Sequence, residues 1–209
     1  MEFVTESFRH AEVILNEPAY IAQYTQLLNI IAGVTDDDLI AKHESYSLAL
    51  PEGRPKSLSV AINELLRERF TAAGWVAEAK IFHPAQYADK HWRLDFAKDD
   101  ISIEVAFNHG EAIAWNLTKP VLASELNHVE KEIQTRIGVI IAATQGMKEA
   151  GGFDGAVGTY EKFLEYLPVM RNVLTAPLLI IGLCEPRTFR MVQRTNAKGR
   201  KYGVIERLE

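Results

Sequence analysis

The chain has 209 residues, of which 47% are hydrophobic and 24% charged, with a formal net charge of −5 at pH 7. This length and composition are sufficient to bury a core, and we expect one domain over residues 1–209. No apolar run approaches the roughly 18 residues that a membrane span requires, and the acidic start MEFVTESFRH is unlike a signal peptide. We therefore predict a cytoplasmic protein without a membrane partner.

The residue types argue against several kinds of chemistry. Cys184 is the only cysteine, which excludes an intramolecular disulfide, and the apolar run before it predicts a core thiol. The six histidines show no spacing typical of a zinc site. Residues 146–158 are rich in glycine but lack the Gly-Lys-Ser/Thr ending of a phosphate-binding loop, and no serine lies in a Gly-x-Ser-x-Gly turn.

The first quarter of the chain is predicted to be helical. Hydrophobic residues recur at helical spacing over residues 8–31, with a break near Asn16. Residues 33–55 are polar and end in PEGRP, a composition typical of a surface loop. A further helix is expected to begin near Ser59 and to end at Gly74, because glycine is a common helix terminator.

The rest of the chain is predicted to alternate strands with helices. Strands are expected over residues 76–82, 94–96, 101–107, 137–143 and 177–183, and helices over residues 117–132 and 159–172. The last two strands are almost continuously apolar, which is typical of strands that are buried on both faces. This order predicts a mixed α/β sandwich without internal repeats.

The stretch from Arg93 to His109 carries the strongest indication of function. Apolar residues alternate with polar or small ones over residues 101–107, which is the period of a half-buried strand. Residues 98–100 are a polar break short enough for a hairpin that brings Asp95 and Glu104 close together. Two adjacent carboxylates repel each other and persist best with a shared divalent cation.

A basic segment follows the last predicted strand. Phe189, Gly199 and Tyr202 interrupt its charges, which favours an ordered hairpin against a polyanion over a solvated tail. No acidic residue lies between Pro186 and Val204. The six basic residues are Arg187, Arg190, Arg194, Lys198, Arg200 and Lys201.

Five segments in order, RHAEVILN, LDFAKDDISIEVAFN, IGVIIAATQG, TYEKF and APLLIIGL, resemble the BglII/BstYI group of type II restriction endonucleases. The resemblance covers residues 8–185. It implies the restriction-endonuclease-like PD-(D/E)XK fold, in which helices flank a mixed central β-sheet. It also implies a homodimer that hydrolyses double-stranded DNA at a short palindrome with a GATC core.

The resemblance also implies roles for individual residues. By position, Asp95 and Glu104 match the two acids that bind Mg²⁺, and Ca²⁺ is expected to support binding without cleavage. Glu78 falls where relatives carry a further acidic or amide group beside the metal. Lys98 fits the group's Asp-Phe-x-Lys run as a phosphate contact, and a solvated turn residue is an equal alternative.

Ala106 departs from the pattern of the group. The third catalytic side chain, two residues after the second acid, is lysine in the superfamily and glutamine or glutamate in this branch. Alanine can neither orient a water molecule nor stabilise charge on a phosphate. Three explanations stay open: a substitution made to trap uncleaved DNA, transfer of the role to Lys98, Asn108 or Glu78, or a naturally inactive relative that only binds DNA.

Base recognition is expected from the elements beside the acid pair. The candidates are Asn108 and His109 after the catalytic strand, the loop over residues 151–160 with Asp154, and the basic segment. The helix predicted over residues 117–132 is a candidate dimer interface, with plain core packing as an equal alternative. A different interpretation, an unrelated α/β protein in which the two acids are structural, also stays open.

Overall fold

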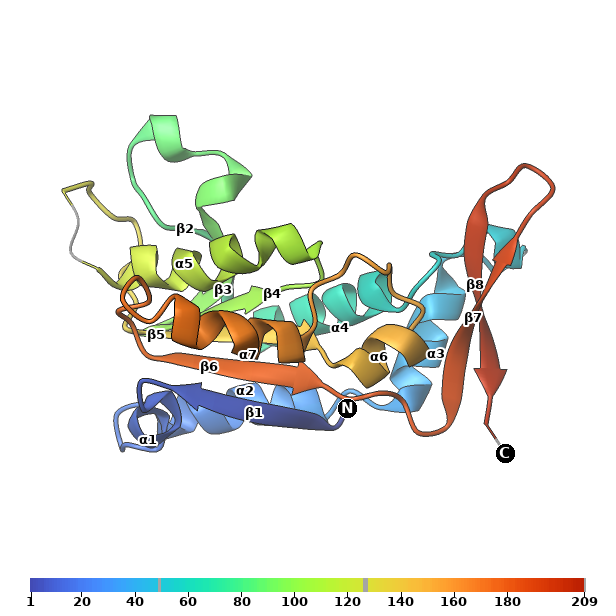
Figure 1. Cartoon of the computed structure of the whole chain (residues 1–209), viewed down its shortest axis with the longest axis horizontal. Helices are drawn as coiled ribbons and strands as arrows, with labels where there is room; N and C mark the ends of the chain where they lie inside the picture. Colours follow the sequence, from blue (N-terminus) through green and yellow to red (C-terminus); the bar gives the residue numbers. More distant parts are fainter. Residues whose placement is uncertain (49, 126–127, 209) are drawn as a thin grey trace.

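The computed structural model describes residues 1–48, 50–125 and 128–208. A mixed six-stranded sheet with the order β1-β6-β5-β4-β3-β2 forms its centre (Figure 1). Neighbouring strands are parallel between β4 and β5 and between β5 and β6, and antiparallel elsewhere. The strands are β1 (Phe3–Phe8), β2 (Val76–Lys80), β3 (Arg93–Lys98), β4 (Ile101–Val105), β5 (Ile137–Ala143) and β6 (Leu178–Leu183).

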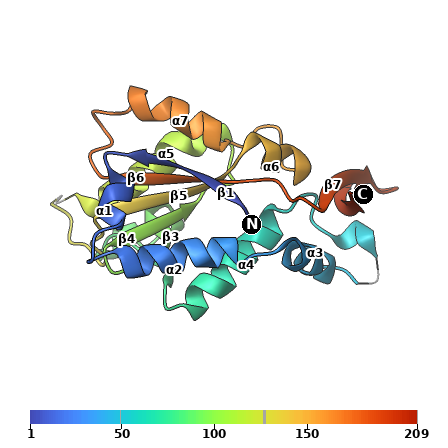
Figure 2. The same ribbon diagram turned by 90° about the horizontal axis from the view of Figure 1, so that it is seen from below.

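Helices cover both faces of this sheet (Figure 2). One face packs against α2 and α4 and the other against α5 and α7, so the chain has a mixed α/β fold of three layers. The α-helices are α1 (Ala11–Leu15), α2 (Ile21–Ala32), α3 (Asp36–Ser45), α4 (Ser59–Ala72), α5 (Ile113–Ser124), α6 (Gln145–Ala150) and α7 (Tyr160–Val169). The short 3₁₀ helices are η1 (Pro51–Gly53), η2 (Ala85–Tyr87), η3 (Lys90–Trp92) and η4 (Gly110–Ala112). None of the helices in the described ranges is long and apolar enough to cross a membrane.

The two apolar strands β5 and β6 are buried along their whole length, as predicted. Val139 and Ile141 of β5 pack with α2 and α4, whereas Ile140 and Ala142 pack with α5 and α7. Both faces of these strands are therefore core. The same holds for β4, so the expectation of a half-buried strand is wrong there: the residues that alternate with its apolar set face α5 and are buried as well.

Several predicted elements differ from the observed ones near the N-terminus. The helices predicted over residues 8–31 are confirmed as α1 and α2, but the first quarter is not helical throughout, because Phe3–Phe8 form the edge strand β1, which pairs with β6. The surface loop predicted over residues 33–55 contains α3, whose N-terminus is closed by a capping box between Thr35 and Asp38. Gly74 has a φ of 83°, which is consistent with its predicted role just after α4.

Later elements are shifted rather than absent. The helix predicted over residues 117–132 begins earlier and ends earlier, as α5, in spite of Pro120 in its interior. The glycine-rich stretch contains α6, which Thr144 caps through a hydrogen bond from the Met147 amide. Cys184 is half-buried rather than a core thiol, because it lies just past the end of β6.

The basic segment forms the predicted hairpin. Strands β7 (Phe189–Thr195) and β8 (Lys201–Arg207) make a separate two-stranded sheet that projects at one end of the molecule (Figure 1). The hairpin is anchored by Gly203, whose amide donates to the Pro55 carbonyl at 2.9 Å and whose carbonyl lies 3.2 Å from His43 Nε2.

Candidate active site

The β3–β4 hairpin places the two predicted acids side by side. Phe96 pairs with Ile103, so Asp95 and Glu104 are the next opposed positions along the two strands. At this point the Val105 amide donates to Asp95 Oδ2 at 2.7 Å, so the Asp95 carboxylate takes the place of a backbone carbonyl acceptor. The tight connection that sets this register contains Asp99, at a φ of 48°.

Glu104 is a buried acid with one oxygen uncommitted. Its side chain is 2% exposed, and burial followed by repulsion from Asp95 raises its pKa to about 8. Oε2 forms an ion pair with Lys119 of α5. Oε1 is buried and has no hydrogen-bond partner among the described residues. A buried carboxylate oxygen without a partner is costly unless a further ligand binds it.

Asp95 lies between the buried acid and a cavity. Burial raises the pKa of Asp95, and the Val105 amide and the Lys119 ammonium oppose that rise. The cavity, of about 230 Å³, is also lined by Glu78 of β2 and by Arg67 of α4. The carboxylates of Asp95 and Glu78 therefore line a space that a small ligand can enter, and Glu104 is not part of that lining.

Glu78 occupies an unusual position on the edge strand. It lies opposite Asp95, between the pairs Ala77–Phe96 and Ala79–Leu94, and has a φ of 52°. Its carboxylate forms a half-exposed ion pair with Arg67 at 3.2 Å. A non-glycine residue with positive φ costs free energy, and such residues are concentrated at functional sites.

The donor set fits a magnesium ion better than a transition metal. No group of three or more His, Cys, Asp or Glu side chains in the described ranges is arranged to hold a metal. Magnesium commonly uses one or two protein carboxylates and completes its shell with waters and phosphate oxygens. Asp95 and the uncommitted Oε1 of Glu104 meet that requirement.

Lys119 is a site residue that the sequence did not predict. It is 8% exposed, and its Nζ donates to the Arg93 carbonyl at 3.0 Å as well as pairing with Glu104. The only sequence signal is a lysine inside the otherwise apolar stretch of α5, directly before Pro120.

Ala106, where the resemblance implies a third catalytic side chain, belongs to the core. It is 2% exposed and packs in the cluster that contains Ile113 and Leu117 of α5. Its amide donates to the Ile141 carbonyl at 2.8 Å. No polar side chain therefore projects from this strand position toward the acids.

Lys98 is placed in a different environment from the acid pair. Its Nζ donates to Gln26 Oε1 and to the Ala73 carbonyl, both at 2.9 Å, on the side of the sheet that faces α2 and α4. Its two partners come from α2 and from the end of α4, which pack near the turn of the β3–β4 hairpin. This geometry favours a structural role over the phosphate contact.

The segments predicted to read bases are joined to one another. His109 forms an isolated bridge with Val157, and the Gly158 amide donates to the Asn108 carbonyl at 3.0 Å. Both Asn108 and His109 are exposed. The segment after β4 and the loop after α6 therefore form one continuous surface.

This loop also contacts the basic hairpin. Gln193 Nε2 of β7 donates to the Gly152 carbonyl at 2.7 Å. Asp154, on the same loop, pairs with Lys56 at 2.7 Å, and that contact lowers the pKa of the Asp154 carboxyl to about 2. Strands β3 and β4, the loop after α6 and the β7–β8 hairpin follow one another along the molecule (Figure 1).

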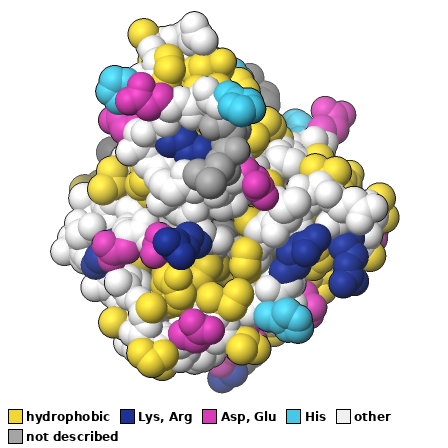
Figure 3. Space-filling view, turned by 90° about the vertical axis from the view of Figure 1, so that its left-hand side faces the viewer, with side chains coloured by type: hydrophobic (Ala, Val, Ile, Leu, Met, Phe, Trp, Pro, Cys, Tyr) yellow, Lys and Arg dark blue, Asp and Glu magenta, His cyan; other side chains and the backbone are white. Residues whose placement is uncertain are grey.

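The six basic residues of the hairpin segment fall into two groups. Arg187 pairs with Glu2, and Arg190 pairs with Glu206. The other four are exposed and have no ion-pair partner within the described part of the chain. They are Arg194, Lys198, Arg200 and Lys201. At the opposite end of the molecule, basic side chains are instead interspersed with acidic ones, histidines and hydrophobic side chains (Figure 3).

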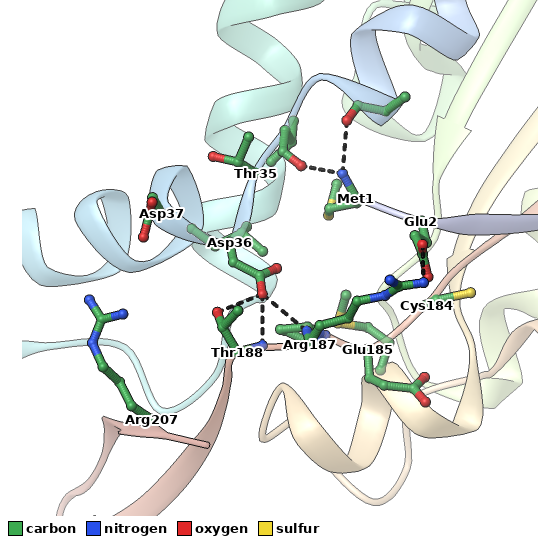
Figure 4. Close-up of a pocket in the computed structure, with 15 residues that line it drawn as sticks. Met1, Glu2, Thr35, Asp36, Asp37, Cys184, Glu185, Arg187, Thr188 and Arg207 are labelled. Atoms are coloured by element: carbon green, nitrogen blue, oxygen red, sulfur yellow. Dashed lines mark hydrogen bonds and ion pairs between the residues drawn. The ribbon is translucent and has the colours of Figure 1, made fainter. Parts of the chain in front are cut away.

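A larger cavity, of about 730 Å³, lies at the junction between the hairpin and the body (Figure 4). Asp36 accepts hydrogen bonds from the amides of Arg187 and Thr188 and from the Thr188 hydroxyl. The N-terminal amine of Met1 bonds to carbonyls at the end of α2. These groups satisfy one another, so the junction anchors the hairpin and does not resemble a catalytic site.

The three-layer fold and the adjacent acids are those expected of a restriction endonuclease. The family described as "Restriction endonuclease BglII/BglIII" matches residues 3–183. The chain belongs to this family.

Solved structures agree on the fold. The chain is similar to the crystal structure of restriction endonuclease BglII complexed with a DNA 16-mer, with a TM-score of 0.64, 17% identity and full coverage of both chains. It is also similar to free BglII, with a TM-score of 0.50, 15% identity and the same coverage. No curated protein sequence matches the chain.

Proposed function

We propose that this chain is a Mg²⁺-dependent endonuclease that hydrolyses double-stranded DNA at a short palindrome. The observation that carries the proposal is the pair of adjacent acids, Asp95 and Glu104, with one buried carboxylate oxygen left without a partner in the described structure. Within a restriction endonuclease family, such a pair is best explained as the metal site.

Asp95, which lines the 230 Å³ cavity, and Glu104, opposite it on β4, would hold the ion. The ion would supply a Lewis acid that activates the attacking water and offsets charge on the scissile phosphate. The protein's own contribution is positional: the Val105 amide fixes Asp95, and Lys119 fixes one oxygen of Glu104. No covalent intermediate is needed.

We place the DNA along the surface that runs from the end of β4 to the hairpin. Exposed arginine and lysine side chains contact phosphates, and asparagine, histidine and arginine can reach base edges in the major groove. Asn108 and His109 follow the end of β4, and Asp154 lies on the loop that His109 contacts through Val157. The GATC core of the site rests on the resemblance to the family.

A palindromic site is best matched by a homodimer, because two copies related by a two-fold axis present the same surface to each half-site. The α5 helix is a weaker candidate for the interface than the sequence suggested. Most of its side chains are buried in the core of this chain, including Ile113, Leu117 and Val121.

A catalytically inactive DNA-binding relative is the second candidate. The observation that favours it is Ala106, which fills an apolar position where relatives carry a catalytic side chain. In that case the chain binds the same DNA but does not cleave it.

Plasmid cleavage separates the two candidates. The chain and an Ala106→Gln variant are incubated with Mg²⁺ and a plasmid that contains several GATC sequences, and duplex binding is measured in Ca²⁺. Discrete fragments from the unaltered chain support the endonuclease, and fragments from the variant alone identify an inactivated one. Intact plasmid from both, with binding retained, favours the inactive relative.

Two controls complete this experiment. A plasmid without GATC tests the core of the site, since it should stay intact. Thermal unfolding of the Ala106→Gln variant shows whether the larger side chain is accommodated, because overpacking a core costs about 1–3 kcal/mol. Failure of the chain to bind any duplex at low salt would contradict both candidates.

A further inference from the structure

Lys119 reaches the acid pair from a helix and not from the catalytic strand. We propose that Lys119 supplies the cationic group which Ala106 cannot, as a positioning residue that holds Glu104 for the metal. This inference rests on the proposed endonuclease function.

On this face of the sheet, a basic side chain can reach Glu104 from α5 but not from β4. Ser102, Glu104 and Ala106 are the residues of the β4 segment that face α5, and Ala106 is enclosed by apolar side chains. Lys119 projects from α5 over the same face and ends at the Glu104 carboxylate. The ammonium of Lys119 on α5 therefore reaches Glu104. A side chain at position 106, two residues after Glu104, would otherwise supply this contact.

The division of the Glu104 carboxylate also indicates a role in metal binding. Lys119 engages Oε2 and leaves Oε1 without a partner in the described residues. A lysine that served only to neutralise a buried carboxylate would leave that oxygen unsatisfied, at a cost in free energy. A lysine that orients the carboxylate presents Oε1 to a cation.

The ammonium itself has a further donor available. It carries three N–H donors, and two are used in the described structure, on Glu104 and on the Arg93 carbonyl. One donor is left for water or a phosphate oxygen.

A purely structural role is the competing explanation. Buried ion pairs contribute little to stability, because desolvation offsets most of the attraction, so the pair is not explained by its stabilising effect. A structural role and a positioning role differ in what happens to metal binding when the charge is removed.

The test compares Lys119→Met with Lys119→Arg. Methionine keeps the length and apolar stem but removes the charge, and arginine keeps the charge. Lys131→Met is the matched control, because Lys131 also donates to backbone carbonyls of α5, including that of Leu122 at 2.7 Å, but has no contact with the acids in the described structure. Lys119→Gln replaces the methionine variant if that variant does not fold.

Three quantities are measured for each variant: Mg²⁺-dependent plasmid cleavage, affinity for Ca²⁺ in the absence of DNA, and the melting temperature. We expect Lys119→Met to slow cleavage by about 100-fold, and Lys119→Arg by about 10-fold or less. We expect Lys119→Met to bind Ca²⁺ more weakly than the unaltered chain, because Glu104 is no longer held with Oε1 toward the cation, and we expect Lys119→Arg to keep most of the affinity. Lys131→Met should cleave normally.

Each contrary outcome is distinct. Normal cleavage by Lys119→Met overturns the inference and leaves the endonuclease function intact. Parallel losses of cleavage, Ca²⁺ affinity and melting temperature in both Lys119 variants indicate a structural lysine and also overturn it. If the unaltered chain binds DNA without cutting it, Lys119 does not replace the missing side chain, and the proposed turnover fails as well.

Discussion

The β3–β4 acid pair and the β7–β8 hairpin carry the two kinds of charge that a DNA-cutting enzyme needs, in opposite environments. Glu104 is buried, unsatisfied at one oxygen and shifted in pKa, whereas Arg194, Lys198 and their neighbours are exposed and mostly free of ion-pair partners in the described structure. Water and salt screen the hairpin charges strongly and the buried acids weakly.

This difference predicts how the two regions respond to change. Loss of a buried acid should abolish chemistry while leaving DNA binding nearly intact. Loss of exposed cations should weaken binding while leaving the chemistry of bound DNA nearly intact. Salt should act on the hairpin, and pH should act on the acids.

The largest effect is expected from Asp95→Asn. We expect cleavage in Mg²⁺ to fall by at least about 1,000-fold, because one of the two protein ligands for the ion loses its charge. Duplex binding in Ca²⁺ should change by less than about tenfold, since phosphate contacts dominate affinity. Asp100→Asn is the control, because Asp100 lies on the same hairpin but pairs with Arg136. Cleavage by Asp95→Asn at the normal rate would place the metal elsewhere.

The buried acid should also make stability depend on pH. Glu104 has an ordinary pKa of 4.5 and a folded value of about 8, so between these values the unfolded chain loses a proton that the folded chain keeps. Stability is therefore fully present below pH 4.5 and falls as pH rises toward 8, by about 4 kcal/mol.

Urea unfolding at pH 5 and pH 8 without divalent ions measures this change. Glu104→Gln should flatten the dependence, because glutamine stays neutral at both pH values. Saturating Mg²⁺ should reduce the dependence in the unaltered chain. The same pH dependence in Glu104→Gln would show that another group titrates.

A smaller effect is expected from the hairpin. Replacement of Arg194, Lys198, Arg200 and Lys201 by glutamine should weaken duplex binding by about 100-fold at moderate salt. The slope of log affinity against log salt should become shallower by about 0.9 for each phosphate that the variant no longer neutralises. Cleavage at saturating protein should change far less than affinity.

A double variant at the other end of the molecule is the control for the hairpin. Lys80→Gln with Arg171→Gln removes two exposed cations, at the end of β2 and just after the end of α7, that lie outside the proposed DNA surface. Affinity and salt slope should stay close to those of the unaltered chain. If the control variant loses as much duplex affinity per removed charge as the hairpin variant, the hairpin has no special part in DNA binding.

The smallest effect concerns Glu78, whose φ of 52° disfavours any residue except glycine. Glu78→Gly should raise the free energy of unfolding by about 1 kcal/mol, and should slow cleavage by about tenfold. Asp99→Gly is the matched control, because Asp99 also has a positive φ, of 48°, in the β3–β4 turn of the same sheet. This variant should stabilise the protein without slowing cleavage. Unchanged cleavage by Glu78→Gly would remove Glu78 from the site.

The sequence predicted those parts of the fold that depend on local periodicity. The strands β5 and β6, the β3–β4 hairpin and the basic hairpin were recognisable from their own residues. The edge strand β1 was not, because its pairing with β6 joins residues about 175 positions apart and leaves no local signal.

The acid pair was predictable for the same reason, since a nine-residue spacing across a tight hairpin brings its ends together. Lys119 was not, because its contact with Glu104 depends on how α5 crosses the sheet. The covering of both faces of β4 was also missed, because its polar side packs against a helix that lies later in the chain.

A crystal structure of the chain with Ca²⁺ and a duplex that it binds tests the division between the two regions most directly. We predict a cation held by Asp95 and by Oε1 of Glu104, and a sugar–phosphate backbone that runs along the loop after α6 and the β7–β8 hairpin. A cation absent from the acid pair, or a duplex at the end of the molecule opposite the hairpin, would contradict it.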